Sequence, residues 1–187
     1  MTEINLLLSY LRKLAPLDGA MEAYLQNNVS VNHYPKGHIL KSNGITFDRI
    51  WFVGKGLLKS RHFDQNGKQI VTRFWTEYEM ILLKRKNGAA TDTEQIVLLE
   101  DSILLTLTNH QLEVLYTDFH RVHQITRRIY LSELRKRDIR PSLLVMPAAD
   151  AYANFCHLFP CQRLLLQDIA YYLNIRPYSL SRIRRLK

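Results

Sequence analysis

The side chains best suited to direct chemistry lie near the C-terminus of the sequence, where arginines, hydroxyls and one amide follow one another closely. An arginine guanidinium can donate two hydrogen bonds to O6 and N7 of guanine, whereas hydroxyl groups suit base edges or phosphates. This chemistry predicts a surface that contacts double-stranded DNA. Its expected members are Gln167 and Arg176, as phosphate contacts, with Tyr178, Ser179, Arg182 and Arg185.

The apolar residues around this set predict two helices joined by a sharp turn. A small residue lets the helices cross closely, an asparagine tolerates left-handed backbone, an apolar plug follows it, and a proline opens the second helix. This spacing is typical of a helix-turn-helix. The alternative, a basic amphipathic tail that binds an acidic protein or a membrane, leaves the turn residues unexplained. The pattern consists of Ile169, Ala170, Leu173, Asn174, Ile175, Pro177, Leu180 and Ile183.

The charge of the chain is concentrated in the same region. The formal net charge is +9. Residues 1–120 carry 13 basic and 13 acidic side chains, whereas residues 121–187 carry 13 basic side chains against 4 acidic ones. A basic end on a neutral body is the electrostatic pattern expected for nucleic-acid binding, although a basic solubilising face would look the same.

The remaining elements follow from periodicity. The first 30 residues predict two short helices, and residues 31–107 alternate with period two around glycine and asparagine turns, which predicts an antiparallel barrel or jelly roll. Asn109 is a candidate N-cap for a short helix that ends near Tyr116. A long helix is then expected from about Asp118 to Asp138 and should end at Arg140-Pro141.

The long helix has two structural interpretations. Its apolar stripe could pack on the barrel of its own chain, or it could pair with the same helix of a second copy. Paired half-sites on DNA need paired readers, which favours dimerisation. The expected units are a β-roll sensor at 1–117, a dimerisation helix at 118–140 and a helix-turn-helix unit at 141–187. The expected dimer interface is Val122, Ile125, Ile129 and Leu134.

With these motifs in view, the chain resembles the Crp/Fnr family of bacterial transcription regulators over essentially its whole length. Residues 168–185 read DIAYYLNIRPYSLSRIRR, which is similar to that family's IA-x-x-LG-(I/V)-(T/S)-PET-(L/F)-SR-(I/L)-R motif. The match is strongest to the short-tailed members common in Bacteroidetes-type bacteria. Four further segments resemble the same family: Pro35-Lys36-Gly37, residues 52–57, residues 64–68 and Glu100-Asp101-Ser102.

The resemblance implies an α+β fold with a cyclic-nucleotide-binding-like β-roll, a dimerisation helix and a winged helix-turn-helix. It implies duplex DNA, a second copy of the chain and RNA polymerase as partners. Arg182 matches the family's base-reading arginine and Ser179 its threonine, whereas Asn174 replaces a glycine. Tyr178 stands where the family has glutamate, which accepts from cytosine N4, so the operator should differ from that of typical members.

Tight binding of cyclic AMP is not expected. Family members that bind a cyclic nucleotide carry a Gly-Glu pair and a phosphate-clamping arginine, which are missing around Glu77 and from Asp92 to Gln95, and Lys84-Arg85-Lys86 comes too early. Another ligand could use an aromatic pocket, although such residues are more often core. The candidates are Phe74, Trp75, Tyr78 and Glu79.

Other functions find little support. The sequence has no phosphate loop, nucleophile elbow or metal-ligand set, so neither an enzyme nor a bound cofactor is expected. Cys156 and Cys161 should be buried structural cysteines. No secretion signal or membrane-spanning run is present, which predicts a cytoplasmic protein. The favoured function is a DNA-binding regulator, and the alternative is a ligand-binding signalling module whose basic tail binds a partner protein.

Overall fold

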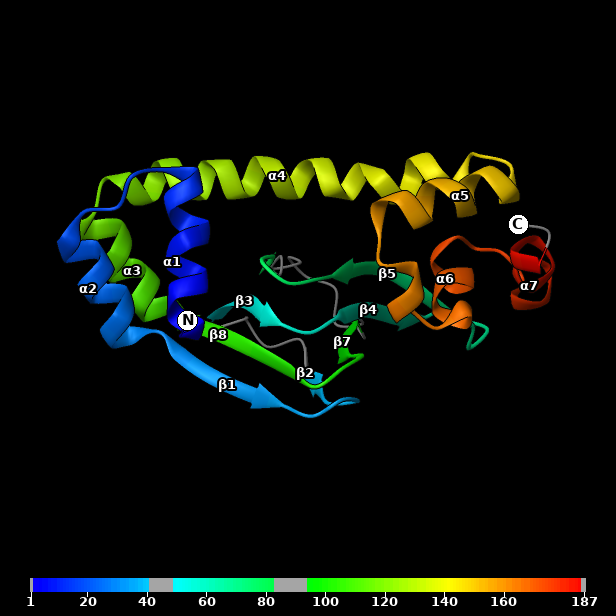
Figure 1. The fold of residues 1–187 in the computed structure, drawn as a ribbon, viewed down its shortest axis with the longest axis horizontal. Helices are drawn as coiled ribbons and strands as arrows, with labels where there is room; N and C mark the ends of the chain where they lie inside the picture. The colour runs from blue at the N-terminus through cyan, green and yellow to red at the C-terminus, as the bar shows by residue number, and fades with distance from the viewer. Residues whose placement is uncertain (1, 41–48, 83–93, 186–187) are drawn as a thin grey trace.

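The computed structural model describes residues 2–40, 49–82 and 94–185. The basic run Lys84-Arg85-Lys86, considered above, lies outside the described residues. Asp92 and Thr93 lie outside them too. Within the described part, one long helix runs along two antiparallel sheets, short helices close one end, and the C-terminal helices close the other (Figure 1).

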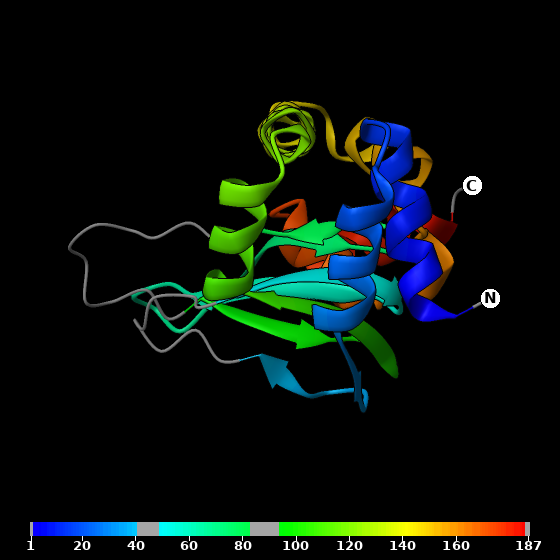
Figure 2. The ribbon, with the colours of Figure 1, turned by 90° about the vertical axis from the view of Figure 1, so that its left-hand side faces the viewer.

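Three short helices form the first end: α1 (Glu3–Leu14), α2 (Gly19–Asn28) and α3 (Asn109–Asp118). The Asp18 side chain caps α2 by accepting from the Met21 N–H at 2.7 Å. The N-cap of α3 is Thr108, one residue before the expected Asn109. Thr108 and Gln111 form a reciprocal capping box. Figure 2 shows these three helices in front of the strands, at the end of the molecule where the long helix begins.

Two four-stranded sheets follow, and every recorded strand pair is antiparallel, as the period-two pattern predicted. The first sheet has the order β1-β8-β3-β6 and the second the order β2-β7-β4-β5. An apolar core that includes Trp51, Trp75 and Leu104 lies between them. The strands are β1 (Ser30–Tyr34), β2 (Ile39–Leu40), β3 (Arg49–Lys55), β4 (Leu58–Phe63), β5 (Gln69–Trp75), β6 (Met80–Ile81), β7 (Gln95–Leu98) and β8 (Ser102–Thr108).

A bulge in β5 turns two apolar residues towards the outside of the second sheet. The register with β4 shifts between the pairs Ser60–Arg73 and Arg61–Val71, which leaves one extra residue in β5. Val71 and Phe74 are three residues apart, yet both join the apolar cluster that the C-terminal helices cover. The sheet therefore has an apolar outer face on which those helices can pack.

Helix α4 (Arg121–Leu144) is longer than expected, since it continues through Pro141. A proline removes one backbone hydrogen bond, but Leu143 in the following turn is buried in the C-terminal cluster, which compensates for that loss. The expected dimer stripe also packs differently: Val122, Ile125 and Ile129 are buried against α1 and the first sheet of their own chain. These three residues are therefore core of this chain, and Leu134 is half-buried.

The C-terminal unit, defined here as residues 148–185, contains α5 (Ala148–Leu158), a 3₁₀ turn η1 (Cys161–Arg163), α6 (Leu166–Tyr172) and α7 (Pro177–Arg185). Cys156 and Cys161 form a disulfide, which the sequence did not predict, and they are half-buried rather than buried. The wing implied by the family resemblance has no counterpart among residues 109–185, which contain no strand.

None of the helices in the described ranges is both long and apolar enough to cross a lipid bilayer. The same residues contain no group of three histidine, cysteine, aspartate or glutamate side chains arranged to hold a metal ion.

Candidate nucleic-acid interface

The turn between α6 and α7 has the geometry that the sequence predicts. Asn174 adopts a left-handed conformation with φ of 53°. The Ile175 N–H donates to the Ala170 carbonyl oxygen at 2.9 Å, which is the six-to-one bond of a Schellman motif. Ala170 and Leu180 are fully buried where the two helices cross, and Ile175 packs beside them. The turn therefore fixes the angle at which α7 leaves α6.

The outward face of α7 is polar, cationic and exposed. Tyr178 is 76% exposed. The predicted residues Arg176, Ser179, Arg182 and Arg185 are exposed as well, and Arg184, which was not predicted, joins them. Gln167 is exposed on α6, where its amide nitrogen donates to the Tyr171 hydroxyl at 2.6 Å. All six predicted contact residues thus lie on one helix pair with free access to solvent.

A buried ion pair joins this helix pair to the second sheet. Lys59 of β4 pairs with Asp168 in the first turn of α6, and their side chains are only 8% and 4% exposed. Among the described residues, the second carboxylate oxygen of Asp168 has no hydrogen-bond partner. The cost of burying two charges is offset only while both partners are present, so this pair resists separation of α6 from β4.

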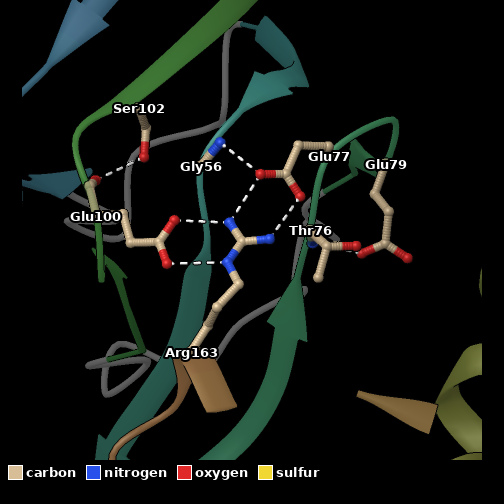
Figure 3. Close-up of polar contacts among 7 residues, drawn as sticks. All are labelled: Gly56, Thr76, Glu77, Glu79, Glu100, Ser102 and Arg163. Carbon is tan, nitrogen blue, oxygen red and sulfur yellow. Dashed lines mark hydrogen bonds and ion pairs between the residues drawn. The ribbon is translucent and has the colours of Figure 1, made fainter. Parts of the chain in front are cut away.

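A second link is the clamp around Arg163, just before α6 (Figure 3). Its guanidinium donates to Glu100 at 2.6 and 3.0 Å and to Glu77 at 2.7 and 3.0 Å. Glu77 also accepts from the Gly56 N–H at 3.1 Å. The hydrogen bonds that Glu77 accepts from Arg163 lower the pKa of Glu77, and the hydrogen bonds that Arg163 donates to Glu100 and Glu77 raise the pKa of Arg163. The clamp ties η1 to two loops of the sheets.

The aromatic candidates for a ligand pocket lie in separate surroundings. Phe74 packs on Phe155, Phe159 and Tyr172 of the C-terminal unit, with ring centroids 5.3 to 5.8 Å apart. Burial there raises the pKa of Tyr172 to about 12. Phe74 is therefore part of the core that holds the C-terminal unit.

The other three candidates do not join Phe74. Trp75 belongs to the core between the sheets. Tyr78 is half exposed, with its ring centroid 6.4 Å from that of Phe52. Glu79 accepts from the Thr76 N–H and pairs with Lys136 of α4. The four residues therefore do not form one aromatic pocket.

An ionic network between the β-roll and α4 was not foreseen from the sequence. Arg73 of β5 pairs with the buried Glu133 at 2.6 Å, and Lys136 bridges Glu133 and Glu79. Burial, followed by the charges of Glu133 and Glu79, raises the pKa of Tyr10 to about 12. In sequence, Glu133 appeared only as one acid in a basic helix, because its partners are distant in the chain.

Comparison with known proteins places this arrangement among solved folds. No protein-family model and no curated protein sequence matches the chain. FixK2 from Bradyrhizobium japonicum is 15% identical with a TM-score of 0.71, over 84% of this chain and 83% of that one. A protein from Eubacterium rectale, described as a transcriptional regulator of the Crp/Fnr family, is 16% identical with a TM-score of 0.70, over 91% and 83%.

A further match covers a smaller share of the chain. A cyclic nucleotide-binding domain from Methylobacillus flagellatus is 12% identical with a TM-score of 0.58, over 72% of this chain and 79% of that one. Identities this low show a common fold and nothing finer. The chain has an α+β fold similar to that of Crp/Fnr-type regulators, with a β-roll similar to that of a cyclic nucleotide-binding domain.

Proposed function

We propose that this protein is a sequence-specific DNA-binding transcription regulator of the Crp/Fnr type, in which α6 and α7 form a helix-turn-helix. The observation that carries the proposal is the exposed cationic face of α7, which begins directly after the left-handed turn at Asn174. The second helix of a helix-turn-helix lies in the major groove, where its exposed side chains reach base edges. The fold shared with regulators of that family supports the same conclusion.

The residues divide into two roles in this proposal. Arg182 donates to guanine O6 and N7, and Ser179 and Arg185 contact base edges or nearby phosphates. Arg176 and Gln167 bind phosphates on either side of the groove. Tyr178 faces the bases in place of the family's glutamate, so it sets a different preference at that position.

Two copies of the chain should act together on one operator, and α4 offers a stripe for pairing. This stripe shares Leu134 with the interface expected from the sequence, but its other members are exposed and lie on the side of the helix opposite the buried Val122, Ile125 and Ile129. Leu131 is 45% exposed and Val145 is 85% exposed. The stripe consists of Leu131, Leu134, Pro141 and Val145, whose spacing of three, seven and four residues follows a heptad.

The β-roll is proposed to act as the sensor, without cyclic AMP as its signal. The proposed units are those expected from the sequence, 1–117, 118–140 and 141–187, with α4 continuing across the second boundary to Leu144. The proposed cell compartment is the cytoplasm. RNA polymerase is the partner that a transcription regulator would finally engage. The ionic network of Arg73, Glu133 and Lys136 is the route by which a change in the roll would reach α4.

The test is selection of bound fragments from random duplex DNA, followed by binding of the selected duplex over a range of salt concentrations. The logarithm of affinity should fall linearly with the logarithm of salt, with a slope of about −0.9 for each phosphate contacted. Sedimentation should show two chains on each duplex. Failure to enrich any sequence, or binding with no salt dependence, would overturn the proposal in favour of a protein partner.

A further inference from the structure

A lysine of the sensor lies against the turn of the helix pair. The Lys68 ammonium donates to the Asn174 side-chain oxygen at 2.8 Å. Lys68 ends the turn between β4 and β5, whereas Asn174 lies two residues before Arg176 and three before the start of α7. Figure 1 shows this turn beside α6, at the end of the molecule that carries α7.

The turn holds Lys68 firmly. The Asp64 carboxylate accepts from the backbone N–H groups of Asn66 and Lys68, both at 2.9 Å, and Gly67 supplies the positive φ of 73° that the turn requires. The one carboxylate of the turn is therefore already engaged by backbone donors. The Lys68 side chain remains exposed, and its ammonium has two further donors.

The turn is also fixed relative to the helix pair. Strand β5 begins at Gln69 and packs on α6 through the shared core of Val71, Phe74 and Ile169. The buried pair of Lys59 and Asp168 joins the preceding strand to the same helix. The backbone of the β4–β5 turn is therefore held beside α6, where Lys68 reaches Asn174.

We propose that the β4–β5 turn is part of the DNA interface and that Lys68 binds a backbone phosphate next to the one bound by Arg176. This inference rests on the proposed function. A phosphate beside Arg176 would face the Lys68 ammonium as well as the cations of α7, and each added phosphate contact releases about one more counterion. The sensor then contributes directly to affinity, besides positioning the reader.

The experiment compares Lys68→Ala with Lys13→Ala, an equal charge change on exposed α1 at the opposite end of the molecule (Figure 1). Both are titrated against the selected duplex between about 0.05 and 0.3 M salt. For each bound protomer, Lys68→Ala should reduce the magnitude of the slope by about 0.9 and weaken binding about eightfold at 0.1 M salt. Lys13→Ala should match the wild type, and Lys68→Arg should restore the slope.

A second variant tests whether Lys68 contacts a phosphate or only stabilises the α6–α7 turn through Asn174. Asn174→Gly keeps the left-handed backbone but removes the oxygen that Lys68 contacts, so the salt slope should stay at the wild-type value. If Lys68→Ala and Lys13→Ala share one slope while the wild type binds DNA, the inference alone is wrong. If the wild type itself shows no salt-dependent binding, the proposed function fails and the inference fails with it.

Discussion

The two outer faces of the β-roll are covered in different ways. On the first sheet, α1 and the first half of α4 pack through an apolar cluster, and the exposed Arg128 side chain donates to the Leu14 carbonyl oxygen at its edge. On the second sheet, the C-terminal unit adds a buried ion pair and an arginine clamp to its apolar core. Apolar contacts tolerate small rotations, whereas hydrogen-bonded charges fix one orientation.

The face covered by α1 and α4 therefore contributes mainly stability. The face covered by the C-terminal unit also fixes the orientation of that unit on the second sheet. Arg140 supports this view, since its Nε donates to the Tyr172 carbonyl oxygen at 2.9 Å at the end of α6. The exposed cations of α7 are therefore held at a defined angle to the roll. Such an angle matters for a dimeric reader, because the two recognition helices must match the spacing of the DNA grooves.

The largest expected effect is loss of the buried pair on the C-terminal face. Lys59→Ala leaves the buried Asp168 carboxylate without its cation, which should lower the free energy of unfolding by about 3–5 kcal/mol. The measurement is urea unfolding at pH 7. The matched control on the other face is Arg128→Ala, which removes an exposed contact and should cost less than about 1 kcal/mol. Equal losses for both variants would show that the two faces do not differ.

A smaller effect concerns the pH dependence of the Arg163 clamp. The pKa of Glu77 is lowered in the folded chain, so its contribution to stability is present above its ordinary pKa and is lost as the pH falls through the lowered value. Unfolding measured stepwise below pH 5 should therefore show a shallower loss of stability in Glu77→Gln than in the wild type.

Glu22 supplies the control for this prediction. Its pKa is also lowered, by Arg12, but that pair lies exposed on the N-terminal face. Glu22→Gln should change the stability curve while leaving hydrogen exchange in α6 unaltered, whereas Glu77→Gln should increase exchange there. Parallel acid curves for Glu77→Gln and the wild type would contradict a contribution from the clamp.

The parts of the fold that follow from local sequence could be predicted. The Asn66-Gly67 turn, the alternating strands and the residues from Ala170 to Leu180 each carry their own backbone or packing signal within a few positions. The end of α4 could not be predicted, because the burial of Leu143 against distant residues outweighs the local effect of Pro141. Its faces were ambiguous, since α4 has apolar residues on two sides.

The polar links could not be predicted, because their partners are far apart in the chain. Lys59 and Asp168 are separated by 109 positions and Arg163 and Glu77 by 86. Each looks like an ordinary surface charge until the fold brings the two together. A buried lysine within the apolar run Leu57-Leu58-Lys59 was the one available hint, since such a residue needs a counterion.

The most direct test of the account is the binding specificity of Arg182→Ala. On the selected operator and its single-base variants, the wild type should lose about 1–3 kcal/mol when the guanine read by Arg182 is replaced. Arg182→Ala should bind the operator more weakly by a similar amount and discriminate no longer at that one base. Equal weakening on every sequence, or no change at all, would contradict α7 as the reader of the major groove.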